Sequence, residues 1–256
     1  MRRLIAAATA ALALGIAGLT PTAFASTEGA ALPHTEFSHV GIFGKYNKGA
    51  LKRGLQVYRE VCSSCHGLKY IAFRNLIALG VTEDEAKAVA EGYQIPDGPN
   101  DEGEMFERAG RLSDRFPDPF ANEKAARASN NGAYPPDLSL VTKGRDGHEG
   151  YVYAVLIGYE EPPADFELGE GMHYNKYFPG HQIAMPPPLS DGQVTYEDGT
   201  EATVATMSHD VVTFLAWAAE PELEERKAVG LKVLIFIGLL TAVLYAINVR
   251  VWSRVT

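Results

Sequence analysis

The segment Val61-Cys-Ser-Ser-Cys-His-Gly-Leu68 contains the only two cysteines of the chain, three positions apart and followed at once by a histidine. This C-x-x-C-H spacing is typical of c-type haem attachment. Two thiols so placed can each add to one vinyl group of the same porphyrin, and the next imidazole then lies beneath the iron as the proximal ligand. The sequence therefore predicts one haem c, held by Cys62, Cys65 and His66.

The same cysteine pair has other interpretations. Two cysteines in an exported domain form a disulfide by default. A zinc site needs further ligands at comparable spacing, and there is no third cysteine. A thioredoxin-type redox pair follows a strand, whereas Leu51, Leu55 and Tyr58 precede this motif at helical spacing. The motif is therefore expected to close an amphipathic helix, and haem attachment is the favoured interpretation.

Iron bound by one histidine needs a sixth ligand or presents an open site. Methionine or histidine sets the reduction potential and blocks small ligands, whereas an open site suits gas binding or peroxide chemistry. Met185 lies in Phe178-Pro-Gly-His-Gln-Ile-Ala-Met-Pro-Pro-Pro188, where three consecutive prolines stiffen the backbone. We predict Met185 as the distal ligand, with His181 as the strongest alternative.

The two ends of the chain differ from its middle. Residues 1–25 have a basic start, an apolar run and an Ala-Phe-Ala site, the layout of a cleaved secretory signal, although a retained anchor is the alternative. Residues 231–249 are almost continuously apolar and long enough to cross a bilayer as a helix. Export of the N-terminus predicts a periplasmic haem domain over 26–228, a single-pass inner-membrane anchor over 229–249 and a cytoplasmic tail over 250–256.

Composition excludes two broad classes. The 256 residues are 46% apolar, with 12 Tyr and 11 Phe, so the chain can build a core and is not wholly disordered. The 23 Lys and Arg against 32 Asp and Glu supply no basic footprint for nucleic acid. Acids gather in residues 83–104 and 160–170. They are either a solvated face or a rim that steers a basic redox partner.

The remaining pattern predicts loops and short helices without internal repeats. A capping box opens a helix over residues 82–92, which a glycine closes. Residues 96–119 mix Gly, Pro and charges, which predicts a surface insertion without strands. Ser208 is the expected N-cap of a helix that ends at Pro221.

Several segments together resemble the cytochrome c1 family. They run in order towards the apolar stretch and comprise residues 61–68, 97–106, 125–139, 158–163 and 177–187. The resemblance implies a mainly α-helical, cytochrome c-like haem domain with long loop insertions and one C-terminal transmembrane helix. It also implies that the last helix of the soluble domain packs across the helix that leads to the cysteines.

The resemblance assigns roles to individual residues. Cys62 and Cys65 match the cysteines that form thioethers, and His66 and Met185 match the proximal and distal ligands. Arg145 matches an arginine beside a haem propionate, which is sensible because a guanidinium pairs bidentately with a carboxylate. The positions that match the lining of the haem pocket, where apolar surface excludes water, are Asn130, Pro136, Tyr151 and Phe178.

The family's function is a one-electron relay within the cytochrome bc1 complex, the ubiquinol:cytochrome c oxidoreductase. The resemblance implies that the Rieske iron–sulfur protein, reduced by quinol at cytochrome b, delivers an electron to the haem, which passes it to a soluble or tethered cytochrome c. No substrate bond changes on such a chain, so it is a redox subunit and not an enzyme by itself. A dimeric membrane complex is also implied.

Other functions remain open at this point. Another membrane-anchored cytochrome c, serving an oxidase or a dehydrogenase, would share the motif and the anchor but has no reason to share residues 97–163. A haem-based sensor or peroxidase would need a labile or missing sixth ligand. A structural protein with an accidental motif is the third alternative.

Overall fold

Helices account for most of the regular structure in residues 30–254, the part of the chain that the computed structural model describes. The α-helices are α2 (Lys48–Glu60), α3 (Glu83–Glu91), α4 (Glu123–Ser129), α5 (His148–Ile157), α6 (Val204–Ala219) and α7 (Leu223–Trp252). The 3-10 helices are η1 (Cys62–Ser64), η2 (Phe73–Leu79) and η3 (Pro179–His181). The strands form two antiparallel pairs, β1 (Gln94–Asp97) with β2 (Phe106–Ala109) and β3 (His173–Tyr174) with β4 (Gln182–Ile183). The predicted mainly α-helical class is confirmed; the predicted secretory signal lies outside the described residues.

The core is built on α6, which packs against both α2 and α5. Most of α6 is buried, and its Phe214 ring lies 5.8 Å from the Tyr58 ring of α2 and 5.9 Å from Trp217, measured between centroids. Burying such large aromatic side chains is the main favourable term in forming this core. The structure thus has the last helix of the soluble domain lying against the helix that leads to the cysteines, as the resemblance implies.

An ion pair locks α2 to α6 beside this apolar contact. The Arg53 guanidinium donates to both carboxylate oxygens of Asp210, at 2.6 and 3.1 Å, and to Asp198 at 2.8 Å. Asp210 is only 2% exposed, so the bidentate partner is needed to compensate its burial. These hydrogen bonds also raise the pKa of Arg53.

Two sequence predictions of secondary structure are wrong. Residues 96–119 do contain strands, because β1 and β2 pair with Gln94 opposite Ala109. The Arg108 side chain joins the two strands by bonding to Asp97 and also bonds Asp114 at 2.6 Å. The last helix of the head, the part of the chain before α7, starts at Val204 and not after Ser208. The reason is that Thr203 supplies the N-cap, whereas Ser208 is fully buried within the helix.

Two local predictions are confirmed. Thr82 and Glu85 form the capping box of α3, and Gly92 ends that helix. The helix before the cysteines is α2, whose buried face includes Leu51, Leu55 and Tyr58.

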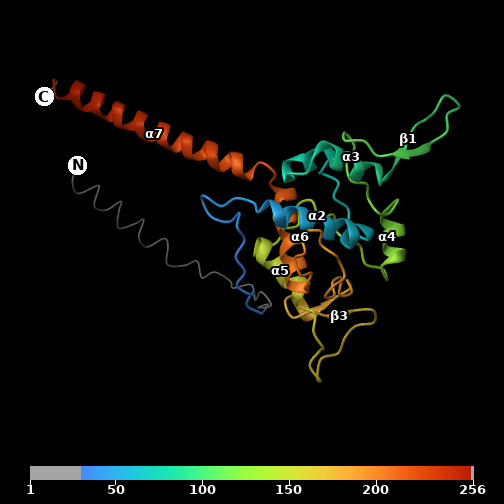
Figure 1. The fold of residues 1–256 in the computed structure, drawn as a ribbon. Coiled ribbons are helices and arrows are strands. Elements are labelled where there is room, and N and C mark those ends of the chain that lie inside the picture. The colour runs from blue at the N-terminus through green and yellow to red at the C-terminus, as the bar shows by residue number, and fades with distance from the viewer. Residues whose placement is uncertain (1–29, 255–256) are drawn as a thin grey trace, which may run out of the picture.

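The helix α7 projects from the head as a single rod (Figure 1). It has 30 residues, and its most apolar window has a mean hydropathy of 2.3 with none of that window buried. At 1.5 Å per residue it is roughly 45 Å long, against ~30 Å for the hydrocarbon core of a bilayer. By length and composition α7 can therefore cross a membrane with its first turns outside the hydrocarbon.

We predict that Gly54→Ala destabilises the head by about 1–3 kcal/mol, since overpacked helix contacts cost that much. A Cβ on Gly54 would collide with the Asp210 carbonyl of α6. Thermal unfolding followed by circular dichroism tests this. Gly49→Ala in the same helix is the control, because its Cβ would meet no backbone atom and only the ends of the Arg53 and Asn47 side chains at 3.3 Å; equal melting temperatures for the two variants would contradict the prediction.

Candidate haem site

The motif forms a tight turn at the end of α2. Helix α2 ends at Glu60, and the amides of Cys65 and His66 both donate to the Cys62 carbonyl, at 3.1 and 2.9 Å. Both cysteines are free thiols and partly buried. Burial raises the pKa of Cys62 to about 12, and the nearby Cys65 contributes a smaller part of this rise. The high pKa disfavours the thiolate that a redox-active pair would need.

The His66 ring is oriented by a backbone carbonyl. Its Nδ1 lies 2.8 Å from the Pro136 oxygen, and a ring proton on Nδ1 leaves the Nε2 lone pair available for a metal. Burial lowers the pKa of His66, which favours this neutral form. The buried Tyr58 hydroxyl donates to the His66 carbonyl at 3.1 Å, so the backbone of the motif is held as well.

Residues 136–139 run against the motif and keep that carbonyl in place. The amide of Leu138 donates to the Gly67 carbonyl at 2.9 Å, and the Lys69 amide donates to Asp137 at 2.9 Å. A Cβ on Gly67 would collide with the Asp118 carboxylate and lie 3.0 Å from Asp137. The close approach of these two acidic side chains explains why a glycine follows the histidine.

Met185 lies on a loop fixed by the end of α5. The Tyr159 hydroxyl donates to the Met185 carbonyl at 3.0 Å. Tyr159 follows directly after the residue that caps α5, and it forms an isolated bridge with Asn175. Burial raises the pKa of Tyr159, so its hydroxyl stays protonated and remains a donor. Sequence reasoning did not single out Tyr159, although residues 158–163 were among the segments that resemble the family.

Asn175 is the second support of this loop. Its side chain is fully buried, donates to the Val155 carbonyl at 2.8 Å and accepts from the amides of Tyr177 and Phe178 at 3.1 and 3.2 Å. A buried amide with both ends satisfied fixes the segments that it joins. The predicted pocket residue Phe178 is therefore positioned through its own backbone.

The ring of His181, the alternative ligand, belongs to a small aromatic cluster. It stacks on Tyr174 with centroids 5.8 Å apart and meets Phe166 edge-on at 6.5 Å. Its Nδ1 lies 3.0 Å from the Lys176 carbonyl. These contacts hold the His181 ring in the cluster, whereas the Met185 loop is held separately through Tyr159, and Met185 stays the predicted distal ligand.

The other predicted pocket residues are less closely joined to the motif. Arg145 is exposed in the turn before α5. Burial raises the pKa of Tyr151, and the positive charge of Arg145 partly offsets this rise. Asn130 caps α4 and donates to the Ala126 carbonyl at 2.7 Å, so its side chain serves its own helix.

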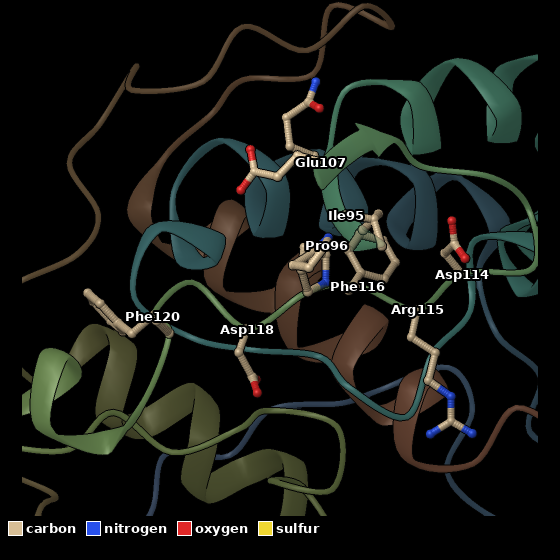
Figure 2. Close-up of a pocket in the computed structure, with 11 residues that line it drawn as sticks. Ile95, Pro96, Glu107, Asp114, Arg115, Phe116, Asp118 and Phe120 are labelled. Carbon is tan, nitrogen blue, oxygen red and sulfur yellow. The ribbon is translucent and has the colours of Figure 1, made fainter. Parts of the chain in front are cut away.

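A surface pocket borders the motif on the side of the β1–β2 hairpin. Figure 2 shows Ile95 and Pro96 from the hairpin facing Phe116, with Asp118 at the rim. Because Asp118 also lies against Gly67, this pocket and the haem motif share one wall.

The donor set fits an iron porphyrin and not a protein-bound zinc ion. Two free thiols, one imidazole with a free Nε2 and one thioether are the groups that attach and ligate a haem c. Among residues 30–254, no three His, Cys, Asp or Glu side chains gather as a metal site. Together with α7, these residues describe a chain with a candidate membrane helix and a candidate c-type haem site.

Comparison with known proteins identifies the family. Residues 37–255 match the Cytochrome C1 family. Cytochrome c1 of Rhodospirillum rubrum is 47% identical over 271 residues, covering 100% of this chain and 98% of that protein. A mitochondrial cytochrome c1 heme protein of Arabidopsis thaliana is 51% identical over 245 residues (93% and 80%), and cytochrome b/c1 of Bradyrhizobium diazoefficiens is 52% identical over 243 (86% and 35%). The chain belongs to the cytochrome c1 family.

We predict that Tyr159→Phe loosens the distal loop, because the lost hydrogen bond to the Met185 carbonyl is worth about 1 kcal/mol. The haem should stay bound while the reduced protein binds carbon monoxide several-fold more readily.

Met185→Leu removes the predicted ligand altogether and so gives the largest expected effect on carbon monoxide binding. The reduction potential of the haem should fall sharply in this variant, and carbon monoxide should bind freely.

Tyr174→Phe is the matched control, since the Tyr174 hydroxyl makes no hydrogen bond among the described residues. Equal carbon monoxide binding by the two Tyr→Phe variants would refute the role of Tyr159. An unchanged potential in Met185→Leu would refute the ligand assignment.

Proposed function

We propose that this chain is the electron-transfer subunit of a cytochrome bc1 complex and carries one haem c bound covalently through Cys62 and Cys65. Family membership over almost the whole chain supports the subunit. The observation that carries the haem assignment is the His66 ring, which is held through Nδ1 with Nε2 free directly after two free thiols. Haem c, when bound, supplies a one-electron redox centre.

The chain's own residues would hold and shield that centre. His66 and Met185 would ligate the iron and exclude small ligands. Tyr151 and Phe178, both half-buried, would exclude water from the ring. The exposed guanidinium of Arg145 would pair with a propionate. Pro136 and Asn130 would line the pocket, Pro136 also orienting His66 through its carbonyl.

The partners follow from this assignment. The Rieske iron–sulfur protein, reduced at cytochrome b, would donate the electron, and a soluble or tethered cytochrome c would accept it, within a dimeric complex. The chain itself would make or break no substrate bond. The head would face the periplasm and the C-terminus the cytoplasm, with Arg250 and Arg254 following the span.

Residues 160–170 are a better docking site for a basic cytochrome c than the acids of the β1–β2 turn. Their acids are exposed, and the segment touches the loop that carries Met185: the Gly169 amide donates to Gln182 at 3.1 Å, and the Phe166 and Tyr174 rings lie 5.1 Å apart. The acids of the β1–β2 turn, in contrast, lie at the far end of a projecting hairpin (Figure 1). A partner bound at 160–170 would therefore be nearer the haem.

Another membrane-anchored cytochrome c is the alternative. The match to the Cytochrome C1 family includes residues 97–163, the segment that such a protein has no reason to share. This argues for the bc1 subunit.

Purification from membranes in mild detergent tests the proposed function. We expect a thioether-type haem c in the pyridine haemochrome spectrum, together with copurifying haem b and an iron–sulfur subunit. Haem c alone, or haem c with an oxidase, would overturn the assignment to a bc1 complex.

We predict that neutralising Glu161→Gln, Asp165→Asn and Glu167→Gln together slows reduction of a basic cytochrome c several-fold at low ionic strength, because electrostatic steering is lost. Salt screens exposed charges, so the difference should vanish at high salt. Stopped-flow kinetics measure both rates.

The matched control neutralises three equally exposed acids of the hairpin turn, Asp101→Asn, Glu102→Gln and Glu104→Gln. An equal or larger effect of this control would move the docking site to the hairpin.

A further inference from the structure

A turn near the start of the described chain exposes three large apolar side chains. Val40 is 60% exposed, Ile42 77% and Phe43 79%. Single exposed apolar residues are common, but three at the tip of one turn form a small patch that water solvates poorly. This patch is unrelated to the haem motif.

The turn is a defined structure. The Val40 amide donates to the Phe37 carbonyl at 3.0 Å, and the Gly44 amide donates to the Gly41 carbonyl at 3.3 Å. Gly41 has a φ of +85°, which suits glycine, and a Cβ on Gly44 would collide with the Val40 carbonyl. The apolar side chains are therefore presented by a tight, hydrogen-bonded turn.

Hydrogen bonds to the end of α6 and the start of α7 show which way the turn points. The Tyr46 hydroxyl donates to the Glu220 carbonyl at 3.2 Å, and the Tyr46 amide donates to Glu224 at 2.9 Å. Two residues earlier in the chain, the Gly44 carbonyl accepts from the Lys227 ammonium at 3.2 Å. Going back from Tyr46 towards the tip, the contacts thus move along the helix towards its apolar part.

The tip reaches the level at which α7 becomes apolar. Lys227 also donates to the His39 carbonyl at 2.6 Å, so both ends of the turn are tied to this one side chain. Leu231 follows four residues later, roughly 6 Å along the helix at 1.5 Å per residue. In Figure 1 the blue loop ahead of α2 projects from the head on the side from which α7 leaves.

We propose that Val40, Ile42 and Phe43 insert into the interfacial region of the lipid bilayer beside α7. Their continuity with the membrane helix argues for lipid as the occupant, and aliphatic and aromatic side chains are those that enter this region. The exposed side chain of Lys45, two residues after Phe43, suits lipid phosphates. The turn and α7 then give the head two points of attachment, which fix its tilt.

The inference rests on α7 spanning the bilayer and not on the haem chemistry, so the spectra and copurification described above do not decide it. Its test is Phe43→Trp in the full-length, haem-loaded chain within its purified complex, reconstituted into phosphatidylcholine bilayers with or without brominated acyl chains. The unmodified complex supplies the signal of the native Trp217 and Trp252. Met105→Trp, on the distant hairpin and at a position 68% exposed, is the control.

We expect brominated lipid to quench most of the emission that Phe43→Trp adds, and acrylamide in the water to quench little of it. Met105→Trp should behave in the opposite way. Emission from Phe43→Trp that acrylamide quenches freely would place the turn in water and overturn the proposal. Emission shielded from both quenchers would also overturn it, because another protein subunit would then cover the turn.

Discussion

The hydrogen bond between the His66 ring and the Pro136 carbonyl is the interaction on which the candidate haem site depends. A histidine beside two cysteines is otherwise free to rotate and to exchange tautomers. The 2.8 Å contact removes both freedoms and comes from a residue 70 positions away in the chain. The carbonyl is itself fixed because residues 137–139 bond the backbone of residues 67–70. The motif supplies the donor atoms, and this distant segment supplies their geometry.

Helix α6 links the two sides of the site. It packs against α2, which ends in the cysteine motif, and against α5, which leads through Tyr159 to the Met185 loop. Arg53 and Asp210 prevent α2 from sliding along α6, and Gly54 brings the two helices into close contact. The predicted proximal and distal ligands, His66 and Met185, therefore share one rigid support, although neither lies on it. A change in the packing of α6 would alter the distance between them.

Features with a local cause could be predicted from the sequence, whereas features with a distant cause could not. The helix before the cysteines, the α3 capping box and the apolar helix each follow from neighbouring residues. The β1–β2 hairpin was missed because its strands are joined through Arg108, whose partners Asp97 and Asp114 give no strand pattern. The start of α6 was misplaced because Thr203 and Ser208 are both good N-caps, and only burial in the core decides between them.

The same distinction applies to the site. The prediction of Cys62, Cys65 and His66 rests on spacing alone, whereas that of Met185 rests on its prolines together with the family resemblance. The assignment of Pro136 came only from the family resemblance, since it contributes a carbonyl that no residue pattern reveals. Tyr159 was missed for a related reason: its hydroxyl matters through a backbone oxygen 26 residues later.

The connection between the head and α7 determines how freely the candidate haem site could move relative to α7. Only residues 220–222 separate α6 from α7, and Glu220 bonds both Lys143 of the head and Arg226 of α7. Tyr46 and Lys227 add a second set of ties from the N-terminal segment. A short connection crossed by this many hydrogen bonds leaves little freedom for the head to swing. The proposed haem would thus be held at one height relative to α7, and its proposed electron donor and acceptor would have to approach it.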